Sequence, residues 1–108
     1  MMVQEFKDIT MNLDYLQVME FVLKVTDSTL KETFKNVEGF ECYYNLNSGI
    51  INIYSDININ LDMETVRILL INEFNKRFKD LFKYNVDIIL DNESNEYFYK
   101  YVFYIHLI

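Results

Sequence analysis

Residues 51–61, with the sequence Ile-Asn-Ile-Tyr-Ser-Asp-Ile-Asn-Ile-Asn-Leu, decide the fold of this 108-residue chain. Apolar and polar side chains alternate, which predicts a β-strand whose side chains point to opposite faces of a sheet. The residues expected on the outward, polar face are Asn52, Tyr54, Asp56, Asn58 and Asn60. One face of the sheet should therefore be buried, and the other should meet solvent or another protein.

A second alternating stretch precedes this strand, and together they predict a β-hairpin. Residues 40–46 alternate, and Asn47-Ser48-Gly49 supplies the turn into a strand over 50–60. The outward residues of the first strand are Glu41, Tyr43 and Asn45, while Cys42 faces inward.

Helical periodicity flanks the hairpin on both sides. Polar residues recur every three or four positions over 6–25, which predicts a helix. The cap-forming cluster 26–29 and the capping-box spacing of Thr29 and Glu32 predict a new short helix over 30–37, closed by Gly39. A later helix should open at Asp62. The apolar stripe of this later helix is Met63, Val66, Leu70, Phe74, Phe78 and Phe82, and the basic residues at its end are Lys76, Arg77, Lys79 and Lys83.

A second hairpin completes the predicted order. Val86, Ile88 and Leu90 begin a strand, residues 92–95 form a loop, and 96–107 return as an aromatic strand. The expected fold is a single α+β domain over residues 1–108, with αββαββ order and a four-stranded, mainly antiparallel sheet that has helices packed on one face. The last strand leaves apolar side chains on its second face, so we expect a second copy of the chain, in a homodimer, or a heterologous partner to cover it. The residues of this expected self-association surface are Phe98, Val102 and Tyr104.

Charge and composition exclude several classes of partner. The chain contains seventeen acidic and ten basic residues, which gives a net charge of −7. This charge disfavours direct binding to nucleic acid or to an anionic membrane. The one cysteine excludes an internal disulfide, and the chain begins without a signal-peptide pattern. These features predict a cytoplasmic protein.

The inventory of reactive side chains argues against an enzyme. His106 is the one histidine, close to the last residue of a strand, and Cys42 is expected to be a buried apolar residue. One His and one Cys cannot close a zinc site, and the two glycines lie outside any phosphate-binding motif. The acidic residues around the second hairpin loop, which lack the spacing of a calcium loop, are Asp87, Asp91, Glu93 and Glu96. We expect no cofactor and no metal.

The outward face is the remaining candidate site. Tyr offers contact area at low entropic cost, amides adapt their hydrogen bonds, and carboxylates pair with basic residues. An ordinary solvated sheet face explains the same pattern. The residues expected to bind a partner are Glu41, Tyr43, Asn45, Asn52, Tyr54, Asp56, Asn58, Asp91, Glu93 and Glu96.

The leading hypothesis is a non-enzymatic acidic inhibitor that blocks a basic protein, such as a nuclease or a nucleic-acid-binding complex. The short, acidic, Tyr-rich character is similar in type to that of phage-encoded anti-CRISPR proteins and toxin-neutralising immunity proteins, although no stretch of residues carries the likeness. The alternative is a self-associating structural or regulatory subunit.

Overall fold

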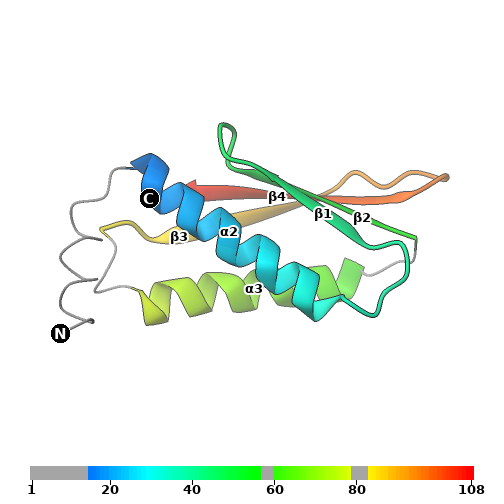
Figure 1. Ribbon diagram of the computed structural model, residues 1–108, viewed down its shortest axis with the longest axis horizontal. Helices are drawn as coiled ribbons and strands as arrows, with labels where there is room; N and C mark the ends of the chain where they lie inside the picture. The colour runs from blue at the N-terminus through cyan, green and yellow to red at the C-terminus, as the bar shows by residue number, and fades with distance from the viewer. Residues whose placement is uncertain (1–14, 57–59, 79–82) are drawn as a thin grey trace.

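The computed structural model describes residues 15–56, 60–78 and 83–108. These residues form α2 (Tyr15–Thr33), β1 (Glu41–Asn45), β2 (Ile50–Ser55), α3 (Asn60–Arg77), β3 (Val86–Asn92) and β4 (Tyr99–Leu107). The strands make one antiparallel sheet in the order β1-β2-β4-β3, and the two helices lie on one side of it (Figure 1). The predicted α+β fold with αββαββ order is therefore confirmed.

The core lies between the helices and the inner face of the sheet. Ile51 and Ile53 of β2 and Phe103 of β4 are fully buried, as the alternation predicts. They belong to the same apolar cluster as the α2 side chains of Val22 and Leu23. The apolar stripe predicted for α3 also holds in the described residues. Its members Met63, Leu70 and Phe74 are buried, Val66 and Phe78 are partly buried, and Phe82 lies outside the described residues.

The predicted break near residue 26 is wrong, because α2 runs unbroken through it. Thr26 and Asp27 are buried instead of capping a new helix, and Asp27 pairs with Lys31 one turn later, at 2.9 Å. Continuing the helix also brings Leu30 and Phe34 into the core. The local preference of Thr26 and Asp27 for a helix N-terminus is therefore outweighed by their burial in the tertiary structure. Of the predicted helix over 6–25, residues 6–14 lie outside the described residues.

The strands β2 and β4 are shorter than predicted. β2 spans Ile50–Ser55 instead of 50–60, and β4 spans Tyr99–Leu107 instead of 96–107. The β2 residues Tyr54 and Ser55 are the last to pair, with Glu41 of β1 and Tyr99 of β4 respectively. Residues 57–59 of the predicted strand lie outside the described residues, and Asn60 already belongs to α3. β4 begins at Tyr99 instead of residue 96, because the preceding residues form a turn. In that turn, Asn95 Oδ1 accepts hydrogen bonds from the backbone N–H groups of Tyr97 and Phe98.

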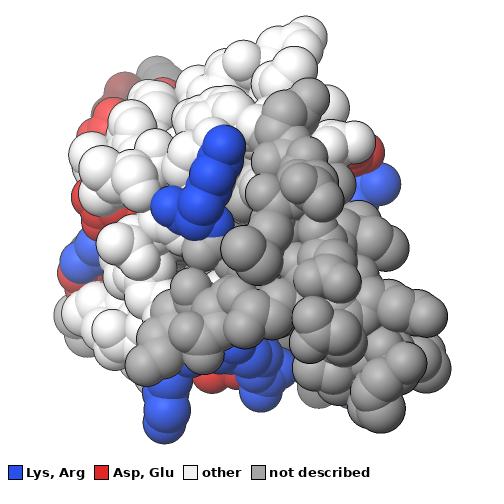
Figure 2. Space-filling model, turned by 90° about the vertical axis from the view of Figure 1, so that its left-hand side faces the viewer, with Lys and Arg blue, Asp and Glu red and all other residues white. Residues whose placement is uncertain are grey.

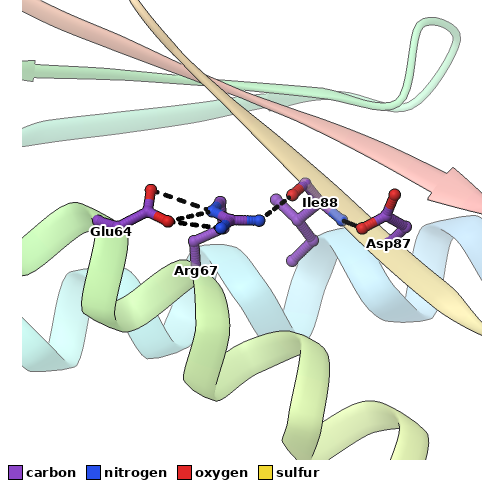
Figure 3. A network of polar contacts seen from close by, with 4 residues as sticks. All are labelled: Glu64, Arg67, Asp87 and Ile88. Atoms are coloured by element: carbon purple, nitrogen blue, oxygen red, sulfur yellow. Dashed lines mark hydrogen bonds and ion pairs between the residues drawn. The ribbon is translucent and has the colours of Figure 1, made fainter.

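The free edge of β3 is covered by side chains of α3. Arg67 lies between Glu64 and the edge, and its Nη1 donates to the Ile88 carbonyl at 2.8 Å (Figure 3). The Asp87 carboxylate accepts a hydrogen bond from the Ile88 N–H at 3.0 Å. These bonds occupy backbone groups that would otherwise be open to pairing with another strand. Neither described helix is long and apolar enough to cross a membrane.

Candidate functional site

The outer face of the sheet, on the side opposite the helices, brings residues from all four strands together. The strand register arranges them in rows of cross-strand neighbours, and such neighbours lie close enough to contact one another. The first row is Glu41, Tyr54 and Lys100, with Glu93 following β3. The second row is Tyr43, Asn52, Val102 and Asp91, and the third is Asn45, Ile50, Tyr104 and Ile89.

Side-chain contacts connect these rows into one network. The rings of Tyr43 and Tyr54 lie 6.4 Å apart, and Lys100 Nζ lies 5.9 Å from the centre of the Tyr54 ring. Lys100 pairs with Glu93 at 3.2 Å, and the Tyr104 hydroxyl donates to the same carboxylate at 3.3 Å. At the other end, the Tyr43 hydroxyl donates to Glu41 at 3.1 Å. We call this set the outer-face network. Its members are Glu41, Tyr43, Tyr54, Glu93, Lys100 and Tyr104.

The electrostatics of the outer-face network fix its charges at neutral pH. Its hydrogen bond with Lys100 lowers the pKa of Glu93, and the same contact raises the pKa of Lys100. Removal from water and the Glu93 charge raise the pKa of Tyr104. The hydrogen bond to Glu41 raises the pKa of Tyr43. The Glu93 carboxylate, the Lys100 ammonium group and the neutral phenols of Tyr43 and Tyr104 are therefore presented together, which suits recognition through hydrogen bonds and ion pairs.

Lys100 is a member of this face that sequence reasoning missed. The ten residues expected to bind a partner include no cation, so the positive charge on this face was not predicted. The signal was present, because alternation along β4 puts Lys100 on the same side as Val102 and Tyr104. Its charge is matched by Glu93, so the face remains poorly suited to holding phosphates.

Seven of the ten predicted partner-binding residues gather on this face. They are Glu41, Tyr43, Asn45, Asn52, Tyr54, Asp91 and Glu93. Asp56 follows the last paired residue of β2, where its carboxylate lies against Gly39. Asp56 and Glu96 instead share the lining of a separate hollow of about 220 Å³ beside the β3–β4 loop. Asn58 lies outside the described residues.

The predicted self-association surface is not separate from the partner-binding surface. Val102 is paired with Asn52, and Tyr104 is paired with Ile50, so both lie on the outer face beside the predicted partner-binding residues. Val102 is only 2 % exposed, because its own neighbours cover it. It cannot contact a second copy without rearrangement. Phe98 remains exposed in the loop before β4.

The two reactive side chains singled out in the sequence, Cys42 and His106, lie in different surroundings. Cys42 is 2 % exposed, and burial together with nearby Asp27 raises the pKa of its thiol well above the ordinary value. A raised pKa keeps the thiol protonated and unreactive. His106 is exposed on β4 opposite Asp87. Within the described ranges, no group of three His, Cys, Asp or Glu residues could hold a metal ion.

Two of the basic residues that were predicted to close the helix over α3 have contacts within the chain. Arg77 pairs with Glu73 at 2.6 Å, and Lys83 lies over the ring of Tyr84. Lys79 lies outside the described residues. Figure 2 looks at this end of the molecule and shows the drawn Lys and Arg side chains at separate points instead of in one patch. The helix dipole accounts for basic residues in a last turn.

Comparisons were made with protein-family models, curated proteins and solved structures, and none of these matches the chain.

Proposed function

We propose that this protein is a non-enzymatic inhibitor that binds and blocks a basic protein through the outer-face network. The observation that carries the proposal is the uneven distribution of charge. The sheet segments 41–56 and 86–107 contain six acidic residues and a single lysine. By contrast, residues 15–35 and 60–77, which include the two helices, each contain three acidic and three basic residues. The net negative charge of the described fold therefore lies with the sheet.

The chemistry of the face supports a protein partner over a small substrate. Tyr43 is exposed, and Tyr54 and Tyr104 are partly exposed, so three amphipathic rings are available over the width of the sheet. Tyr side chains of this kind contribute contact area with little loss of conformational freedom. The ion pair and the hydrogen bonds of the network hold the rings in place before binding, which lowers the entropic cost of association.

The positions of the acidic groups suggest how binding would block the partner. Glu41 of β1 and Asp91 of β3 lie on the two outermost strands of the sheet, three strand spacings apart, which corresponds to about 14 Å. Carboxylates spread over such a width imitate a row of phosphates in a basic groove. The expected partner is therefore a protein that handles nucleic acid, either a nuclease toxin or a nucleic-acid-binding complex of the kind that anti-CRISPR proteins block. The identity of the captured protein decides between the two.

The test is affinity capture with the tagged full-length chain, followed by binding measurements on the purified pair at low and high salt. The double variant Glu41→Lys/Asp91→Lys reverses charge on the outer face only. The matched control, Glu32→Lys/Glu38→Lys, makes the same change in net charge at exposed positions away from it.

The proposal expects a basic partner whose binding is weakened by salt, lost in the outer-face variant and kept in the control. Equal loss of binding in both variants would contradict the proposal, because binding would then depend on the net charge of the protein and not on the outer face. Full binding by the outer-face variant would overturn the proposal.

A further inference from the structure

An apolar groove lies between the two helices, with a volume of about 440 Å³. Its walls include Thr29 and Thr33 of α2, and Leu69, Glu73 and Arg77 of α3. No strand contributes to this lining. The groove therefore belongs to the helix layer, on the opposite side of the molecule from the outer-face network.

Charges around the groove are neutralised within the chain. Residues 15–35 and 60–77, which include the two helices, each carry three acidic and three basic side chains. At the groove itself, Arg77 pairs with Glu73. A surface with balanced charge does not repel an identical surface, whereas the acidic outer face does. Of the two broad faces, the helix layer is the one compatible with a second copy of this chain.

The same surface carries apolar side chains that match the groove in character. Leu69 on its rim is 60 % exposed, and the adjacent Ile68 is 45 % exposed. A two-fold dimer requires a surface that is complementary to itself, because each copy contributes the same patch. A projecting apolar residue beside an apolar groove meets this requirement, since Leu69 of each copy can occupy the groove of the other.

We propose that the helix layers of two copies pack together around this groove, with Leu69 at the centre of the contact. The two sheets then lie on the outside of the dimer, and both outer faces remain open. The proposal holds whether or not the outer face binds a basic partner. It also moves self-association from the predicted surface around Val102 to the opposite side of the molecule.

The test is the mass of the full-length protein in solution, measured by sedimentation velocity over a range of concentrations. The variant Leu69→Glu buries an unpaired charge in the contact and is expected to weaken dimerisation at least a hundredfold. Ile89→Glu is the matched control. It also replaces an exposed aliphatic side chain with a carboxylate, but on the outer face, where Ile89 is 50 % exposed. The wild type and the control are expected to be dimers that resist salt. Leu69→Glu is expected to be a monomer that keeps the circular dichroism spectrum of the folded protein.

Thr33→Arg, at an exposed wall of the groove, provides a second variant should Leu69→Glu fail to fold. It too is expected to be a monomer. A wild type that is monomeric at every concentration up to its solubility limit would overturn the proposal. A dimer that survives both groove variants, or one that is lost in Ile89→Glu, would also overturn it.

Discussion

The side-chain amide of Asn75 takes the place of a neighbouring strand for Val86. Asn75 Oδ1 accepts the Val86 N–H at 2.7 Å, and Asn75 Nδ2 donates to the Val86 carbonyl at 3.0 Å. Backbone pairing of Asn85 with Ile108 sets the ladder between β3 and β4. The next residue, Val86, therefore points its backbone groups toward the free edge, and α3 seals the start of that edge.

Replacing Asn75 with Ala should destabilise the fold. Both backbone groups of Val86, a buried residue, would lose their partners, at a cost of about 1–3 kcal/mol in the free energy of unfolding. The measurement is urea unfolding followed by circular dichroism. Asn72→Ala is the control, because Asn72 is an exposed residue of the same helix and its loss should change the free energy by less than about 0.5 kcal/mol. Equal midpoints for the two variants would show that Asn75 does not seal the edge.

Gly39→Ala should be destabilising for two separable reasons. The residue has a φ of +77°, where a side chain costs about 1–2 kcal/mol, and an added Cβ would lie 1.9 Å from Asp56 Oδ2. In the double variant with Asp56→Ala the clash with the Asp56 carboxylate is removed, while the close approach of the residue-56 Cβ, at 2.9 Å, and the backbone cost remain. The double-mutant cycle should therefore give a favourable coupling of about 0.5–3 kcal/mol in unfolding free energy. Strictly additive effects would show that Asp56 does not restrict this position.

Cys42 should be protected from thiol–disulfide exchange in the folded protein. Its thiol is buried and its pKa is raised, so little thiolate is available at pH 8. Reaction with a chromogenic disulfide reagent should be at least about a thousandfold slower in the native protein than in denaturant, because only the rare unfolded molecules react. Rapid modification under native conditions, with the circular dichroism spectrum unchanged, would contradict the buried position.

The Glu93–Lys100 ion pair should make a pH-dependent contribution to stability. The folded-state pKa of Glu93 is lowered from 4.5, so the stabilisation is present above that value and is lost as pH falls through the lowered pKa. The pKa of Lys100 is raised from 10.5, so stabilisation is lost again as pH rises through the raised value. The difference in unfolding free energy between wild type and Glu93→Gln should therefore be present at pH 7 and smaller at pH 3. Glu96→Gln, at an exposed loop position without a described ion pair, should show no such dependence.

Local periodicity was enough to predict most elements of this fold. The period of two in residues 51–61 identified β2 and its buried isoleucines, and the spacing of Met63, Leu70 and Phe74 identified the buried side of α3. These patterns are reliable because each depends on which face of one element is buried. The predicted partner-binding residues of β1 and β2 came together for the same reason.

The remaining features depend on contacts between distant segments. The end of β2 at Ser55 is set by the lengths of β1 and β4, and β2 alone does not contain that information. The unbroken α2 depends on burial of Thr26 and Asp27, although both residues are good local caps. The pairing of β2 with β4, which sets Val102 beside Asn52, joins segments almost fifty positions apart. Neither periodicity nor composition reveals such a neighbour.

The pairing of β2 with β4 also joins the two halves of the chain, since the strand order unites one αββ unit with the other at this seam. The outer-face network crosses it, because Tyr54 belongs to the first unit and Lys100 to the second. The surface consequently exists only while both units are folded against each other. Any ligand of this surface would bind the native state alone and would draw the folding equilibrium toward it in proportion to its own concentration.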